Sequence, residues 1–311
     1  MALYAVFGQP VLHSKSPQMF RPLLDTSDHY TRIRPVSAED MIHFIQDLNI
    51  KGASITAPFK EDILPLVDYV SEEASAIGAV NCIRNEGGIV LGHNTDHKGV
   101  TNALEEAGVK LQGANVLVLG AGGAAKAAVF GLTRARANVY ISNRTHEKAK
   151  ALAGRYGADL IPWERTAKTP WFDAVVSTLL PEAIPPFAGY MAFGCLLDAV
   201  YKPSRMSEHA RSRRIKTIPG ERWLIWQGIE AARLYINNKK TTKEKPISPE
   251  TLEQHMAEKP CPENLCIFVL NEKSKSDFGE GDYDLVVSAF GKSDKWIAAI
   301  IDEEKHLAFG G

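Results

Sequence analysis

A glycine-rich hexapeptide is the most informative chemical motif in the chain. Gly120-Ala121-Gly122-Gly123-Ala124-Ala125 follows a continuous apolar run, Val116 to Leu119, and precedes a stretch of small residues. A strand-to-helix turn needs glycine where the backbone must approach a pyrophosphate closely. The start of the next helix offers amide groups and a favourable dipole to the phosphates. This context favours a dinucleotide-binding turn over a glycine-rich turn without a ligand.

The residues that follow the second predicted strand indicate which dinucleotide is bound. Asn143-Arg144-Thr145 stands there, with Lys148 one turn later, and no acid occupies the strand end. An acid at this place would hold the ribose hydroxyls of NAD, whereas a guanidinium can grip a 2′-phosphate with two hydrogen bonds. We therefore expect NADP; a solvated basic turn is the alternative.

Alternating strands and helices must position this turn. We expect a strand over 116–119, a helix over 124–134, a strand over 138–142, a helix over 146–155, and strands over 173–176 and 195–198. Continuous apolar strands are typical of a parallel sheet buried on both faces. The pattern predicts a Rossmann-like doubly wound parallel sheet in an α/β protein.

The pattern of the N-terminal segment also predicts an α/β fold, and clusters of polar residues follow the ends of its predicted strands. Strands are expected over 4–7 and 53–57, a helix over 40–48, and a hairpin around Glu86-Gly87-Gly88. The clusters are Ser14-Lys15-Ser16-Pro17, Ser54 to Lys60, Asn81 and Asn94-Thr95-Asp96. Taken singly, such residues suit helix caps and turns as well as binding sites.

Together these clusters resemble the shikimate dehydrogenase family, in its order of elements, over roughly Tyr4 to Lys259. The resemblance implies that Lys60 and Asp96 are catalytic and also touch the substrate. It further implies substrate contacts from Ser14, Ser16, Thr56, Asn81, Tyr201 and Gln227, with the two serines on the substrate carboxylate. Cofactor contacts are implied for the Gly120–Ala124 loop, the Asn143–Thr145 turn and Gly220, and we expect Lys148 and Ala199 to contact the cofactor as well.

The chemistry of these residue types agrees with that resemblance. Oxidation of a carbinol needs removal of the hydroxyl proton, which an amine and a carboxylate can achieve. In the reducing direction, a cationic Lys60 would stabilise negative charge on the carbonyl oxygen. The chain departs from the family at Ser54, where asparagine is usual, at Ala57 for valine, at His97 for glycine, and in a shortened segment over 179–186.

Composition bounds the remaining possibilities. The 311 residues are 45% hydrophobic and 23% charged, with a formal charge of -1, so neither nucleic acid nor an anionic membrane is expected as partner. No apolar run is long enough to span a bilayer, and no secretory signal is evident.

The four cysteines suit reduced thiols. Cys82 and Cys195 are expected to pack as small buried hydrophobic residues, while Cys261 and Cys266 lack the spacing of a zinc site. We expect a cytoplasmic enzyme with reduced thiols and no metal, as a monomer or a homodimer.

These observations predict a substrate domain over 1–97, completed by 219–259, and a cofactor domain over 98–218. The last segment, 260–311, is too apolar for a disordered tail, and we expect a small appended α/β element of unknown role. The resemblance implies reversible reduction of 3-dehydroshikimate to shikimate by NADPH. The alternatives are a quinate or dual quinate/shikimate dehydrogenase, a methylenetetrahydrofolate-type dehydrogenase, and a catalytically idle Rossmann protein.

Overall fold

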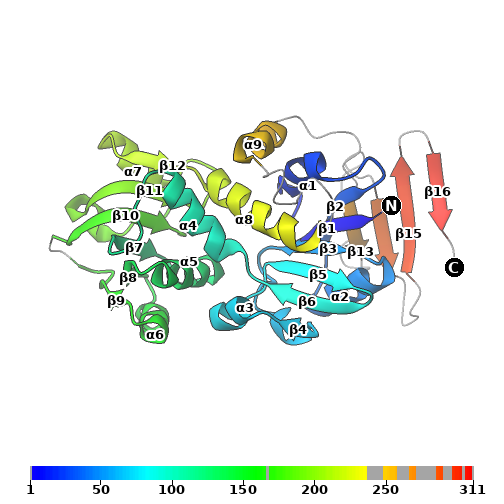
Figure 1. Ribbon diagram of the computed structural model, residues 1–311, viewed down its shortest axis with the longest axis horizontal. Helices are drawn as coiled ribbons and strands as arrows, with labels where there is room; N and C mark the ends of the chain where they lie inside the picture. Colours follow the sequence, from blue (N-terminus) through cyan, green and yellow to red (C-terminus); the bar gives the residue numbers. More distant parts are fainter. Residues whose placement is uncertain are drawn as a thin grey trace. The chain divides into compact units, whose positions relative to one another are not determined.

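The computed structural model describes residues 2–165, 168–236 and 248–257, together with the backbone of four later strands. The chain forms two compact units (Figure 1), and each contains its own sheet and core. The first unit comprises residues 1–75, 79–93 and 231–311, and the second comprises 76–78 and 94–230. Among the helices that the structure describes, none is both long and apolar enough to cross a membrane.

The second unit contains a parallel sheet in the order β12-β11-β10-β7-β8-β9. Counted from β7, this is the order 3-2-1-4-5-6 of a dinucleotide-binding sheet. The strands are β7 Asn115–Leu119, β8 Asn138–Ser142, β9 Asp159–Leu160, β10 Trp171–Ser177, β11 Ala192–Asp198 and β12 Lys216–Ile218. The predicted doubly wound sheet is therefore confirmed.

Helices cover both faces of this sheet because its strands are apolar on both sides. Val116 and Val118 of β7 belong to a core that includes side chains from the helices α4, α5 and α6. Leu117 and Leu119 belong to a second core on the opposite face, with the short helix η3 and with α7. The bounds are α4 Asp96–Glu106, α5 Gly123–Arg134, α6 His146–Tyr156, η3 Pro186–Tyr190, α7 Arg205–Ser212 and α8 Gly220–Tyr235.

The first unit contains a mixed sheet in the order β16-β15-β14-β13-β2-β1-β3-β5-β6-β4. Strands β2, β1 and β3 are parallel, while β5 and β6 form the predicted hairpin, with Gly87 and Gly88 at positive φ. The bounds are β1 Leu3–Phe7, β2 His29–Arg34, β3 Gly52–Ile55, β4 Tyr69–Val70, β5 Cys82–Glu86 and β6 Ile89–His93. The helices are α1 Ser16–Phe20, α2 Ala38–Asp47, α3 Glu72–Ile77 and α9 Pro249–Ala257, with short 3₁₀ turns at Arg21–Leu23 and Leu64–Leu66.

Local signals explain the helix α2. Ser37 and Asp40 form a reciprocal capping box at its start. Met41, Phe44 and Ile45, spaced for one helix face, are buried in the core of the first unit. The predicted helix over 40–48 is thus confirmed, with bounds shifted by one or two residues.

The strands after residue 260 join the sheet of the first unit. β13 Cys266–Leu270 pairs in parallel with β2, and it is followed by β14 Leu285–Ala289, β15 Trp296–Asp302 and β16 Lys305–Phe309. The described elements of this segment are all strands. Cys261 lies outside the described residues.

Candidate active site

The glycine turn of the second unit has the backbone that the motif requires. Gly120 follows β7 with φ of 116°, and a Cβ there would lie 2.1 Å from the Thr178 hydroxyl. At Gly122 and Gly123, by contrast, a Cβ would meet no protein atom within 4 Å. No side chain caps the start of α5. The turn therefore combines a position that only glycine fits with open space at a helix N-terminus, where a phosphate could bind.

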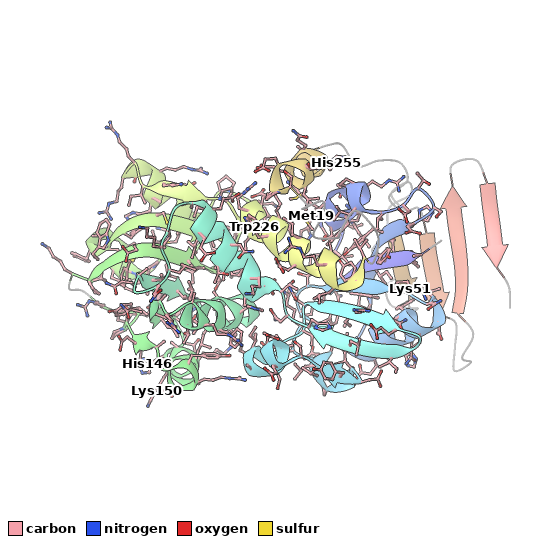
Figure 2. The ribbon with its side chains drawn as sticks, in the orientation of Figure 1. Met19, Lys51, His146, Lys150, Trp226 and His255 are labelled. Carbon is pink, nitrogen blue, oxygen red and sulfur yellow. The ribbon has the colours of Figure 1, made fainter. Side chains whose placement is uncertain are left out.

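The basic turn follows the neighbouring strand at the same edge of the sheet. β7 and β8 are parallel and Leu119 lies beside Ser142, so both turns leave the carboxyl edge. The side-chain Nδ2 of Asn143 donates to the Thr145 carbonyl over 3.0 Å, which closes the turn. Arg144 and Lys148 are exposed. Figure 2 labels His146 and Lys150 on α6, the helix that begins after this turn. Both cations, Arg144 and Lys148, are accessible to a phosphate.

The next two strand ends complete this edge. Thr178 follows β10, and both its amide and its hydroxyl donate to the Leu119 carbonyl over 2.9 Å. β11 ends at Asp198, which is buried and accepts a hydrogen bond from the Ser204 hydroxyl. Burial raises the pKa of Asp198, although hydrogen bonds from Ser204, Val200 and Ser177 oppose the shift. A Cβ at Gly220 would lie 2.7 Å from the Ala199 carbonyl, so glycine lets α8 begin directly against the end of β11.

The predicted catalytic aspartate lies at the start of α4. Asp96 is buried, and its amide donates to the Asn94 side chain over 3.1 Å. Trp223 of α8 donates from Nε1 to the Asp96 carbonyl over 2.9 Å. A Cβ at Gly99 would lie 2.5 Å from the Trp223 ring, so glycine allows α4 and α8 to approach closely. Trp223 was not anticipated from the sequence.

Two predicted substrate residues lie near Asp96. The Thr95 hydroxyl donates to Gln227 Oε1 over 3.3 Å, which links α8 to the residue before Asp96. Tyr201 is 43% exposed, but protein atoms crowd its hydroxyl. This burial raises the pKa of Tyr201, and the charges of Asp96 and Glu221 raise it further. The second unit thus gathers Asp96, Tyr201 and Gln227 in one region.

The first unit gathers the other predicted residues at the carboxyl ends of its parallel strands. The Thr56 amide donates to the Phe7 carbonyl over 2.9 Å, and Ile55 donates to the Asn81 carbonyl over 2.7 Å. The Lys60 carbonyl accepts from Val80 over 2.7 Å, which fixes the residue beside Asn81. Thr56, Lys60 and Asn81 are therefore held in one region by backbone hydrogen bonds.

The serine pair is also ordered. The Ser14 hydroxyl donates to the Ser16 hydroxyl over 3.2 Å and accepts from the Ser16 amide over 3.3 Å. Arg32 of β2 donates to the Ser14 carbonyl from Nε over 2.9 Å and from Nη2 over 2.6 Å. Arg32 was another residue that the sequence did not single out.

Two of the departures from the family pattern, Ser54 and His97, have structural explanations. Ser54 forms a buried cluster of hydroxyl groups, 2.8 Å from Tyr30 and 3.3 Å from Tyr235. His97 is buried, with its ring edge-on to Phe130 at 5.3 Å. Both substitutions are accommodated within the interior of a unit. Cys82 and Cys195 are free and buried, as expected.

Comparison with known proteins decides the family. A shikimate dehydrogenase (NADP(+)) of Aquifex aeolicus is 33% identical over 243 residues, which cover 75% of this chain and 90% of that protein.

The chain belongs to the shikimate dehydrogenase family. Residues 6–83 match the model of the shikimate dehydrogenase substrate binding domain, and residues 102–177 match that of shikimate / quinate 5-dehydrogenase. A second relative, the NADP(+) enzyme of Syntrophobacter fumaroxidans, is 36% identical over 73% of this chain and 84% of its own length. The resemblance seen in the motifs is therefore confirmed.

Solved structures of family members agree with the fold. Shikimate 5-dehydrogenase of Thermus thermophilus, solved with NADP(H) and shikimate, has a TM-score of 0.71 at 33% identity. The match covers 82% of this chain and 98% of that one. A 5-ketofructose reductase of Gluconobacter shares the fold with a TM-score of 0.68 at 24% identity, over 82% of this chain and 97% of that one.

Proposed function

We propose that the chain is an NADP-dependent shikimate dehydrogenase, which interconverts 3-dehydroshikimate and shikimate in aromatic amino-acid biosynthesis. The observation that carries this proposal is the placement of Asp96 with Gln227 and Tyr201 in the unit that also holds the glycine turn. Relatives at 33% and 36% identity are named for this NADP(+)-dependent reaction. The family match also favours shikimate dehydrogenase activity over that of a methylenetetrahydrofolate-type dehydrogenase.

The residues at the strand ends of the second unit fit NADP. Gly122 and Gly123 leave open space at the start of α5, where a pyrophosphate would accept backbone hydrogen bonds. Arg144 and Lys148 would hold the 2′-phosphate, with Asn143 and Thr145 shaping that turn. Ala199 and Gly220 would line the nicotinamide end. When bound, NADP would supply an acceptor for the hydride of the carbinol carbon, and NADPH would supply the hydride donor for the reverse direction.

The chain's own contribution to the chemistry is proton transfer and charge stabilisation. During oxidation, the Lys60 amine takes up the hydroxyl proton of shikimate and becomes an ammonium, and the Asp96 carboxylate acts with it as the second acid-base group. During reduction, the Lys60 ammonium stabilises negative charge on the carbonyl oxygen and supplies the proton. Trp223 fixes the backbone of Asp96 by its hydrogen bond to the carbonyl.

The remaining polar residues recognise the ring acid. Ser14 and Ser16 donate to its carboxylate, since hydroxyl groups can reorient and donate. Thr56, Asn81, Gln227 and Tyr201 bind the ring hydroxyls, and the two amides can both donate and accept.

A steady-state assay of shikimate oxidation tests the proposal. Purified enzyme is expected to reduce NADP with shikimate far more efficiently than NAD, as judged by kcat/KM. Turnover of quinate at equal efficiency would instead support the dual quinate/shikimate activity, which the name of the second matching model also covers. Absence of turnover with either acid would favour a catalytically idle protein and reject the proposal.

The reaction needs only the ring acid and the cofactor as partners. We place it in the cytoplasm, where buried thiols such as Cys82 and Cys195 remain reduced. The enzyme is expected to be a monomer or a homodimer, which sedimentation of the full chain distinguishes.

A further inference from the structure

Arg32 is a buried cation in the first unit. It lies in β2 and is 5% exposed. Its guanidinium donates to the Ser14 carbonyl from two nitrogens and to Gln18 Oε1 from Nη2 over 2.9 Å. Both acceptors are neutral oxygens, and within the described part of the chain no carboxylate forms an ion pair with Arg32.

A guanidinium in this setting retains its charge, because arginine does not lose its proton in proteins. Burial of a charge without an opposite charge is unfavourable, even when hydrogen bonds satisfy the group. An anion that binds nearby would offset this cost. The Ser14 and Ser16 hydroxyls lie on the turn that Arg32 holds, and they can donate hydrogen bonds but carry no net charge.

We propose that Arg32 is the positioning residue that makes the serine pair selective for a carboxylate. It fixes the Ser14 carbonyl with a two-nitrogen contact, so that the hydroxyls of Ser14 and Ser16 are ordered before the substrate arrives. Its charge also favours an ionised acid over an uncharged ring compound. This inference rests on the proposed function, because it names the group that selects the acid in the same site.

The test compares Arg32→Gln with Arg32→Lys, using shikimate and its methyl ester. Arg32→Gln removes the charge and one of the two contacts, whereas Arg32→Lys keeps the charge. Arg84→Gln is the matched control, because Arg84 is a partly exposed arginine of the same unit that pairs with Glu86. Melting temperature and the KM for NADP are measured for each variant to establish that the fold and the cofactor site persist.

Arg32→Gln is expected to raise the KM for shikimate about 10- to 100-fold and to change kcat less than about threefold, as loss of a charged hydrogen-bonding group predicts. The kcat/KM for the methyl ester should fall much less, and Arg32→Lys should recover a large part of the loss on shikimate. An unchanged KM in Arg32→Gln would overturn the inference. So would equal losses on acid and ester, or an Arg32→Lys variant as impaired as Arg32→Gln, because these outcomes indicate a merely structural role.

The wild-type enzyme separates this inference from the proposed function. If the wild type turns over shikimate and the kinetics of Arg32→Gln are unchanged, only the proposed role of Arg32 is rejected. Absence of wild-type turnover rejects the proposed function, and the inference falls with it.

Discussion

The indole nitrogen of Trp223 donates a hydrogen bond to the carbonyl oxygen of Asp96 over 2.9 Å. The two residues lie 127 positions apart in the chain, on α8 and at the start of α4. Gly99 makes this approach possible, since any side chain there would collide with the Trp223 ring. The backbone of the proposed catalytic carboxylate is therefore fixed by a helix much later in the sequence.

Replacement of Trp223 by Phe keeps most of the ring packing but removes this hydrogen bond. We expect a loss of about 1 kcal/mol in the free energy of unfolding, and a kcat about three- to tenfold lower because Asp96 becomes less well placed, on the order set by one hydrogen bond. Urea denaturation and steady-state kinetics measure the two effects. Trp226→Phe is the control, because Trp226 donates to Glu106 near the surface, and it should leave kcat unchanged.

Alanine substitutions at Gly120 and at Gly122 of the glycine turn should have different effects on stability and on NADP binding. Gly120→Ala should destabilise the fold strongly, because φ is 116° and the new Cβ would lie 2.1 Å from the Thr178 hydroxyl. Gly108→Ala controls for backbone strain alone, with φ of 94° and no atom within 4 Å. Gly122→Ala should leave the melting temperature nearly unchanged and weaken NADP binding, since its Cβ would fill space that is otherwise open. Normal NADP affinity in Gly122→Ala would argue against a phosphate at this turn.

Arg144 should discriminate between the two nicotinamide cofactors. Arg144→Gln removes the guanidinium that we propose to contact the 2′-phosphate, so the KM for NADP should rise about 10- to 100-fold while that for NAD changes less than about twofold. Lys150→Gln, which removes an exposed charge from the helix that follows this turn, is the control. Equal effects of Arg144→Gln on both cofactors would refute the phosphate contact.

Asp198 should make stability depend on pH. Burial raises its pKa in the folded protein, so the folded state binds a proton more tightly than the unfolded state. The stability associated with this group is therefore greatest in acid and is lost as the pH rises from about 4, the ordinary value for Asp, through the raised pKa. Asp198→Asn removes this dependence, so its melting temperature relative to wild type should increase as the pH rises toward about 7. A difference that does not change with pH would contradict the raised pKa.

Local patterns predicted the parts of the fold that depend on neighbouring residues. The glycine turn, the strand β7 and the hairpin around Gly87 each carry their signal within a few positions. The strand β2 was not predicted, because Tyr30, Thr31 and Arg32 do not form an apolar run in the sequence. All three side chains are nevertheless buried. The partners that allow Arg32 to be buried come from the Ser14 turn and from Gln18, and a local pattern does not contain them.

The site residues that were predicted and those that were missed differ in the same way. Asp96, Gln227 and Tyr201 were found by resemblance, and their proximity within one unit comes from the structure. Trp223 was missed, because its hydrogen bond to Asp96 depends on the packing of α4 against α8. The pairing of β13 with β2 was equally inaccessible, since strand pairing joins segments far apart in the chain.

The most direct test of the account is the kcat for shikimate oxidation in Lys60→Met, in Asp96→Asn and in the double variant. If the amine and the carboxylate act in one proton-transfer step, each single change should lower kcat about 10²- to 10⁴-fold with an intact fold, and the double variant should be little worse than the poorer single one. An unchanged kcat in Lys60→Met would contradict the account.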